Sequence, residues 1–120
     1  MKREREFADY LRDIVVAIEK AESFTEGMDY ERFVKDEKTV FAVIRALEII
    51  GEAIKNLPEQ VRKERPDVNW RGFAGIRDRL IHGYFTVDLS RIWETVRKDL
   101  PGLLEATREL LEKALRGELK

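Results

Sequence analysis

The sequence of 120 residues contains no cysteine, a single histidine and three prolines. Without cysteine the chain can form neither disulfides nor thiolate metal sites, and one histidine argues against a zinc site. Its longest apolar run is far shorter than the roughly 20 residues that cross a bilayer, and the charged residues 2–6 do not form a signal peptide. We therefore expect a cytoplasmic protein with no metal, no cofactor and no membrane partner.

Neither sign of charge is in large excess, because 23 lysines and arginines stand against 24 aspartates and glutamates. That balance argues against a protein that coats nucleic acid along its whole surface. Between residues 62 and 79, however, six basic residues stand against three acidic ones. Such a local excess could attract a phosphate backbone, or it could be an ordinary solvated face.

Apolar residues recur at helical spacing along most of the chain, without strand-like alternation of useful length. Helices are expected over the segments 2–21, 36–57, 59–65 and 70–82, from Asp88 and from Pro101, with one short turn at 30–34. Asp36 and Asn69 are predicted N-caps, and Trp70 and Phe73 are assigned to the core rather than to base stacking. We predict an all-α, up-down bundle of four to five helices, forming a single domain over residues 1–120.

The predicted helix 36–57 is apolar over roughly 220° of its circumference, whereas a helix with one buried side needs a stripe of about 100° or more. This helix is therefore either central in the bundle or in contact with a second subunit, most simply in a two-fold dimer. Its polar side carries Glu48 and Glu52 one turn apart. Either Arg45 and Lys55 bridge these two like charges, or one of the carboxylates reaches across to orient Arg77.

The only histidine lies in a short segment, residues 77–84, that is rich in functional side chains. Imidazole titrates near neutrality, and a guanidinium binds phosphate through two parallel hydrogen bonds. Arg77 and His82 lie roughly 140° apart on a straight helix, whereas Asp78 and His82 are i,i+4 neighbours. Gly83 is predicted to end the helix, so that the following turn could bring Tyr84 and Arg77 into one cleft. A histidine near a helix end can equally be a capping or packing residue.

Arg77, His82 and Tyr84 form the pattern R-x4-H-x-Y, which resembles the signature of HEPN-domain toxins of the HepT family. Chain length is also similar, and the likeness covers nearly the whole sequence. Further similarity is found in the segment Leu47-Glu48-Ile49-Ile50-Gly51-Glu52-Ala53, at Trp70 and at Asp88.

The resemblance implies a HEPN-like homodimer in which the two motifs line a shared cleft and cleave RNA without a metal. It also implies the toxin of a type VII-like toxin–antitoxin module, silenced when an MntA-like nucleotidyltransferase transfers AMP to the motif tyrosine. In this chain Arg77 would stabilise the phosphate, His82 would carry the proton and Tyr84 would accept the AMP. Asp78 and Glu52 would support these catalytic residues.

Cleavage of RNA without a metal needs a base for the 2′-hydroxyl, an acid for the leaving oxygen and a cation for the developing charge. One chain offers one histidine, whereas a symmetric dimer offers two. An AMP group on Tyr84 would add bulk and negative charge, which repels an anionic substrate. Many family members carry asparagine after the motif arginine. The carboxylate of Asp78 could orient His82, but it would also repel a phosphate.

A function of another class stays open at this point. The same cleft could hold a nucleotide phosphate in a non-catalytic, nucleotide-binding or regulatory subunit of a minimal nucleotidyltransferase pair. His82 could also have only a packing role in a structural dimer. Growth arrest on expression that His82→Ala relieves would favour the toxin, whereas tight nucleotide binding without toxicity would favour the regulatory subunit.

Overall fold

The computed structural model describes residues 6–82 and 88–119, and this part of the chain folds into helices and turns without a strand. The helical segments are α1 (Phe7–Phe24), α2 (Tyr30–Lys35), α3 (Glu37–Lys55), α4 (Glu59–Arg62), α5 (Trp70–His82), α6 (Leu89–Glu94), the π-helix η2 (Thr95–Asp99) and α7 (Leu100–Leu115). They form a bundle with principal extents of 44 × 29 × 28 Å. The predicted all-α architecture is confirmed.

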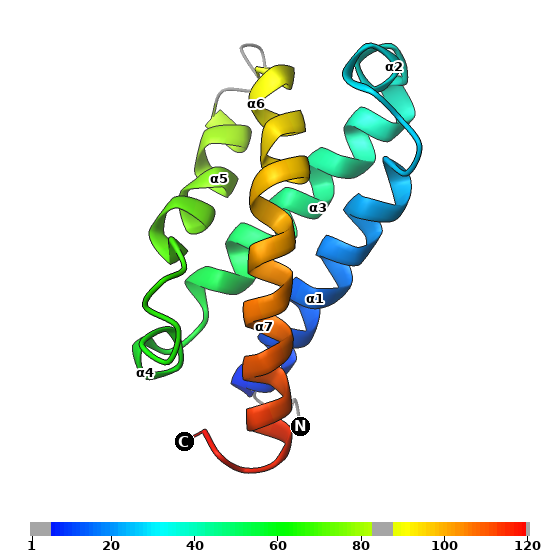
Figure 1. Cartoon of the computed structure of the whole chain (residues 1–120). Coiled ribbons are helices and arrows are strands. Elements are labelled where there is room, and N and C mark those ends of the chain that lie inside the picture. The colour runs from blue at the N-terminus through cyan, green and yellow to red at the C-terminus, as the bar shows by residue number, and fades with distance from the viewer. Residues whose placement is uncertain (1–5, 83–87, 120) are drawn as a thin grey trace, which may run out of the picture.

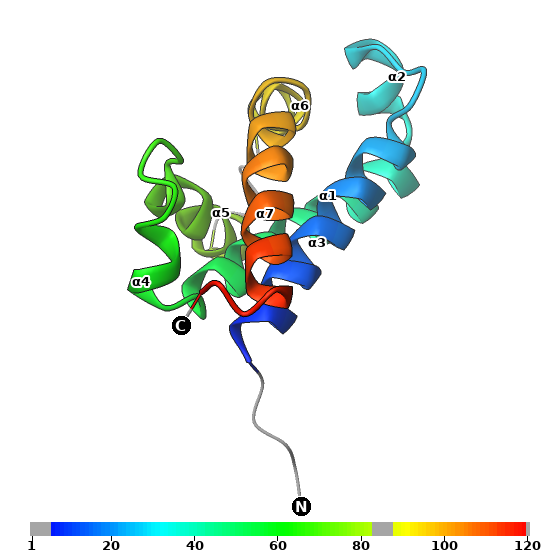
Figure 2. The ribbon, with the colours of Figure 1, turned by 60° about the horizontal axis from the view of Figure 1, so that its bottom comes forward.

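Helix α3 is the centre of the bundle. It packs against α1 on one side and α5 on another, and α7 lies against α1 (Figures 1 and 2). Val43, Leu47, Ile50 and Ile54 of α3 are 0–1% exposed. Burial against several helices at once explains most of the wide apolar face that the sequence predicts for this segment.

The predicted helix starts are confirmed by their capping bonds. The Asp36 carboxylate accepts a hydrogen bond from the backbone N–H of Thr39 at 3.1 Å, and the Asn69 side-chain oxygen accepts one from Gly72 at 3.1 Å. Each bond satisfies an N–H that has no partner within its helix. The short turn is also present as α2, with its Phe33 fully buried.

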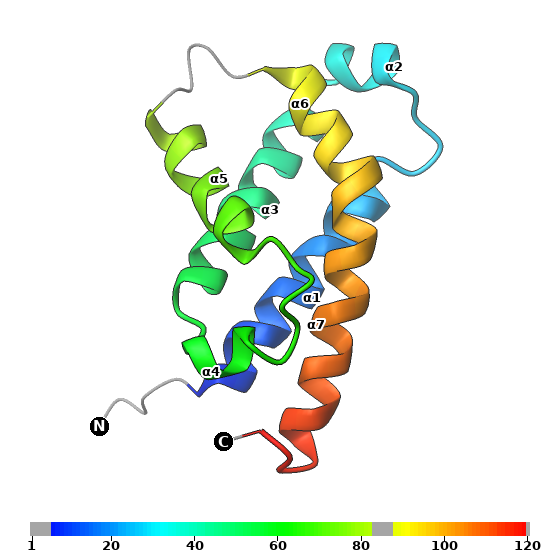
Figure 3. The same cartoon turned by 60° about the vertical axis from the view of Figure 1, so that its left-hand side comes forward.

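Helices begin close to Asp88 and Pro101 as predicted, but they are not separate, because η2 joins α6 and α7 into one continuous helical run (Figure 1). Pro101 lies in the first turn of α7. A proline lacks the N–H of the helical ladder, and its ring crowds the carbonyl four residues earlier, here that of Arg97. The ladder widens to a π-helix over Thr95–Asp99 and then resumes. The proline thus follows an interruption of the regular hydrogen bonds, and the run bends between α6 and α7 (Figures 2 and 3).

Two arginines fasten the connecting segments to this run. Arg97 donates hydrogen bonds to the carbonyls of Thr25 and Met28, both at 2.8 Å, and so holds the turn after α1. Arg65 pairs with Glu105 of α7 at 3.0 and 3.1 Å and thereby holds the connection that leads to α5. The start of α5 is therefore fixed relative to α7.

The indole of Trp70 anchors the first turn of α5. Its N–H donates to the carbonyls of Arg62 and Arg65 at 3.1 and 3.0 Å, and the side chain is 7% exposed. The assignment of this tryptophan to the core is confirmed. Over residues 6–82 and 88–119, no helix has both the length and the apolar character that a bilayer span requires.

Candidate active site

The candidate site lies where α5 crosses α3, and Gly51 sets the distance between the two helices. A β-carbon added at Gly51 would lie 2.9 Å from the β-carbon of Arg77 and 3.2 Å from the carbonyl oxygen of Phe73. Only a residue without a side chain permits this approach. The glycine therefore brings the backbone of α5 against α3 at the motif arginine.

Glu52, the residue after Gly51, forms an ion pair with this arginine. Its carboxylate lies 2.7 Å from Nε of Arg77, and the two side chains are 53% and 36% exposed. Glu48, one turn earlier, lies instead 3.7 Å from Arg45 of its own helix. Of the alternatives left open by the sequence, the structure thus has one carboxylate of α3 reaching across to Arg77, and this carboxylate is Glu52.

Asp78 is paired with Lys55 of α3. The Lys55 ammonium lies 2.7 Å from Oδ1 of Asp78, and Nη1 of Arg77 lies 3.4 Å from the same oxygen. The hydrogen bond from Lys55, followed by the charges of Lys55 and Arg77, lowers the pKa of the Asp78 carboxyl below its usual range. Lys55 therefore does not bridge Glu48 and Glu52. It offsets the negative charge that Asp78 places beside the motif arginine.

The ion pairs hold the Arg77 guanidinium at Nε and Nη1 and leave Nη2 available. The Glu52 carboxylate lies 2.7 Å from Nε, and Nη1 donates a long hydrogen bond of 3.4 Å to Asp78. Within the residues that the structure describes, Nη2 donates no hydrogen bond. This end of the group can donate to an incoming anion while the other end stays fixed.

A hollow of about 270 Å³ opens beside Arg77 on the α1–α3 side. Three carboxylates line it, those of Asp13, Glu48 and Glu52, against the two cations Arg45 and Arg77. Acidic groups disfavour the approach of a phosphate from this direction. An anionic substrate would therefore reach Arg77 from another side of α5.

The remaining motif residues follow Arg77 along the chain. Helix α5 includes His82 as its last residue, in agreement with the predicted helical turn. The side chain of His82, the predicted stop at Gly83 and the acceptor Tyr84 lie outside the described residues. The roles of His82 and Tyr84 stay predictions.

Two features of the site were missed by reasoning from the sequence. The first is the function of Gly51 in the helix contact, and the second is the pairing of Lys55 with Asp78. A glycine inside a helix costs up to about 1 kcal/mol relative to alanine, which is a signal of a close approach. Lys55 follows Glu52 by three residues, so the two side chains lie on one helix face and reach neighbouring residues of α5.

Comparison with known proteins adds to this geometry. A family model described as "Ribonuclease HepT-like" matches residues 14–110. A protein of Thermococcus cleftensis named "Probable ribonuclease HepT" is 52% identical over 99 residues, which cover 82% of this chain and 90% of that protein. A candidate RNase of Caldanaerobacter subterraneus subsp. tengcongensis is 44% identical over 104 residues, or 87% and 93% of the two chains. Another, from Methanocaldococcus jannaschii, is 42% identical over 109 residues, or 91% and 89%. No solved structure matches the chain.

Proposed function

The chain belongs to the HepT-like ribonuclease family, and on this premise we propose that it is an endoribonuclease that cleaves RNA without a metal, using Arg77 and His82. The observation that carries the proposal is the ion pair that holds Nε of Arg77 at 2.7 Å from Glu52, five residues before the only histidine. An arginine held at Nε presents its Nη2 group to a phosphate with little loss of side-chain freedom.

The proposed reaction is an attack of the ribose 2′-oxygen on the neighbouring phosphorus, with cleavage of the bond to the 5′-oxygen. His82 would take the proton from the 2′-hydroxyl, and a second histidine, from the other subunit, would protonate the leaving oxygen. Arg77 would stabilise the negative charge that gathers on the phosphate oxygens in the transition state. Each group then performs one step, and the two-fold dimer supplies the second histidine.

Asp78 is compatible with this scheme in spite of its charge. The ammonium of Lys55 and the guanidinium of Arg77 both contact its Oδ1. The four charges of Glu52, Arg77, Asp78 and Lys55 alternate in sign along the chain of contacts and sum to zero. A phosphate that binds Nη2 of Arg77 therefore meets a neutral cluster rather than an isolated carboxylate.

An exposed apolar surface on α3 and its neighbours is the dimer interface in this proposal. Phe41 is 65% exposed although it lies on α3, the central helix of the bundle. It lines a groove of about 570 Å³ together with Val40, Ile44, Leu80 and Leu89. Leu80 lies on α5 between Arg77 and His82, so a second subunit seated in this groove brings its own motif close to the first.

The proposed activity is tested with purified protein and a single-stranded RNA in the presence of a metal chelator. We expect the wild-type chain to cleave the RNA and His82→Ala to be at least about a hundredfold slower, since general acid–base catalysis contributes at least that much. Equal cleavage by both proteins would contradict the proposal and would point to a contaminating nuclease. Tight binding of a nucleotide without cleavage would favour the regulatory subunit instead.

We also propose that the chain is the toxin of a toxin–antitoxin module and that an MntA-like nucleotidyltransferase controls it by transferring AMP to Tyr84. The test is the intact mass of the chain after co-expression with such a partner. Increments that match AMP are expected for the wild type and not for Tyr84→Phe. Modification that persists in Tyr84→Phe would assign the acceptor to another residue, since Tyr10 and Tyr30 are the only other tyrosines in the sequence.

A further inference from the structure

Helix α5 carries a second cationic side, which faces away from Glu52. Arg79 follows Arg77 by two residues, which places it roughly 200° further around the helix. It lines a cleft of about 470 Å³ whose other wall comes from the continuous run of α6, η2 and α7. Figure 3 shows α5 and this run on the two sides of the bundle that the cleft separates. This cleft and the acidic hollow beside Arg77 thus lie on different sides of the same helix.

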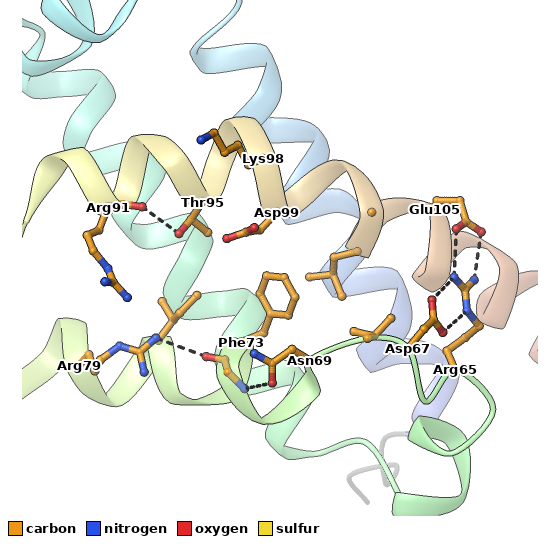
Figure 4. Close-up of a pocket in the computed structure, with 15 residues that line it drawn as sticks. Arg65, Asp67, Asn69, Phe73, Arg79, Arg91, Thr95, Lys98, Asp99 and Glu105 are labelled. Atoms are coloured by element: carbon orange, nitrogen blue, oxygen red, sulfur yellow. Dashed lines mark hydrogen bonds and ion pairs between the residues drawn. The ribbon is translucent and has the colours of Figure 1, made fainter.

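Two guanidinium groups share one end of the cleft. Arg79 extends from α5 and Arg91 from α6, and both point into the space between the helices (Figure 4). The hydrogen bond from Arg79 to the carbonyl of Gly72 is long, at 3.4 Å. Within the described residues neither arginine forms an ion pair with a carboxylate, whereas Arg65 at the other end of the cleft is paired with Asp67 and Glu105.

Like charges that face each other repel unless an anion lies between them. A phosphate satisfies this arrangement well, because two guanidinium groups can each donate paired hydrogen bonds to it. Among the labelled residues that line the cleft, the carboxylate nearest to this end is that of Asp99, on the same run as Arg91 (Figure 4), and the Asp88 carboxylate at the start of α6 also interacts with the charge of Arg91. Lys98 also lines the cleft, but its ammonium extends away from the two arginines (Figure 4).

The middle of the cleft is apolar, with Val68, Phe73, Ile76 and Leu103 among the residues that line it. An apolar surface next to a pair of cations matches the two parts of a nucleotide, its base and its phosphate. The cleft also lies near the reacting end of α5. His82 follows Arg79 by three residues, and such positions are neighbours on a helix surface. By helical spacing, the position of His82 lies roughly 60° from Arg79 and 140° from Arg77.

We propose that the cleft between α5 and the α6–η2–α7 run binds the phosphodiester backbone of the RNA substrate, with Arg79 and Arg91 holding a phosphate next to the one that is cleaved. This inference rests on the proposed ribonuclease function and adds a binding site to it. RNA would then approach the catalytic residues from the cationic side of α5 and avoid the acidic hollow.

The test measures binding of a labelled single-stranded RNA to the His82→Ala protein, which separates binding from cleavage. Arg79→Gln and Arg91→Gln are added together, and the matched control carries Lys20→Gln and Lys38→Gln, which remove the same charge from exposed positions on α1 and α3. We expect the arginine pair to weaken binding about tenfold or more. The slope of log affinity against log salt should fall by about 0.7, the value for one lost phosphate contact on a single strand. The control should change affinity less than about twofold.

Several outcomes would overturn the inference. Unchanged affinity and salt slope in the arginine variant would remove the cleft from RNA binding, while cleavage by the wild type would leave the proposed function intact. Failure of the His82→Ala protein to bind RNA would contradict both. Binding of free AMP as tight as that of RNA, lost in the arginine variant, would make the cleft a nucleotide site instead. If the double variant fails to fold, Arg91→Gln alone tests whether the cleft binds RNA, because Arg91 is exposed and its substitution leaves the fold intact. This single variant should weaken RNA binding at least about threefold.

Discussion

Glu52 has the most specific task among the single residues of the site, because its carboxylate determines where the Arg77 guanidinium points. We predict that Glu52→Ala slows RNA cleavage about tenfold or more, since a mobile arginine must be ordered again in each transition state. Single-turnover rates at saturating RNA measure the effect. Arg77 itself is retained, so RNA affinity should change much less than the rate.

The matched control for this prediction is Glu59→Ala. Glu59 also pairs with a cation, Lys63 at 3.7 Å, but both side chains are more than 70% exposed and lie on α4. Its removal should leave the cleavage rate within about twofold, because exposed surface pairs contribute little. A similar loss of rate in both variants would mean that Glu52 acts only through overall charge.

The sequence predicts the identity of the site residues better than their contacts. Glu48 and Glu52 are equivalent candidates on paper, because they lie one turn apart on one face. The choice depends on the height at which α5 crosses α3, and Gly51 determines that height through its contact with Arg77. Such a tertiary contact leaves only an indirect trace in the sequence, namely a glycine inside a helix.

Among the helices, the contact between α3 and α5 is the one on which the site depends. We predict that Gly51→Ala destabilises the fold by about 1 kcal/mol, because a cost of roughly 1–3 kcal/mol for overpacking exceeds the gain of up to about 1 kcal/mol in helix propensity. The midpoint of urea unfolding measures this change. The cleavage rate should also fall, because the added methyl group displaces Arg77.

Gly102→Ala should change the stability of the same chain in the opposite direction. Gly102 lies in α7, and a β-carbon added there meets no atom within 4 Å. The substitution then changes only helix propensity, which favours alanine over glycine, so we expect stabilisation by up to about 1 kcal/mol. If both substitutions stabilise the protein, the helices do not approach as closely at Gly51 as the structure shows.

Helix positions and capping residues follow largely from the sequence, because apolar spacing and N-cap side chains act locally. The continuity of α6, η2 and α7 does not. Pro101 removes a hydrogen bond when it lies inside a helical run, but packing of α7 against α1 and of α6 against α2 keeps the segments in one run. The proline thus predicts that the helical hydrogen bonds are interrupted, whereas tertiary packing decides whether the helix ends there or continues.

At the scale of the whole molecule, the proposed dimer can be tested at Phe41. We predict that Phe41→Glu converts the dimer into a monomer and removes most of the cleavage activity, because a buried charge without a partner is unfavourable in an apolar interface. Light scattering coupled to size-exclusion chromatography measures the mass. Leu115→Glu is the matched control, since Leu115 is 64% exposed, almost as much as Phe41, but lies at the end of α7. Dissociation by Leu115→Glu and not by Phe41→Glu would move the interface to α7.

The response to acid is a second property of the whole molecule. Contacts lower the pKa values of the Asp36, Asp67, Asp78 and Glu105 carboxyls in the folded chain. Below their ordinary values, 3.8 for Asp and 4.5 for Glu, the unfolded chain therefore binds more protons than the folded one. The stabilisation is present above these values and is lost as the pH falls through the lower, folded ones.

We therefore expect the thermal midpoint of unfolding to be nearly constant from about pH 8 to pH 5 and to fall as the pH is lowered toward about 3. Calorimetry at a series of pH values measures this dependence. Asp78→Asn, which removes one of the titrating groups, should make the fall shallower. A midpoint that rises on acidification would contradict the ion pairs described for the folded chain.

The central claim is that the two subunits contribute their motifs to one composite site, and mixed dimers test it most directly. Wild-type and His82→Ala proteins are unfolded together, refolded as mixed dimers and assayed for RNA cleavage. A mixed dimer has one histidine where the proposed reaction needs two, so we predict that it cleaves RNA at least about a hundredfold more slowly than the wild-type dimer. Proven mixed dimers that keep about half of the wild-type rate would contradict the composite site, because each subunit would then act alone.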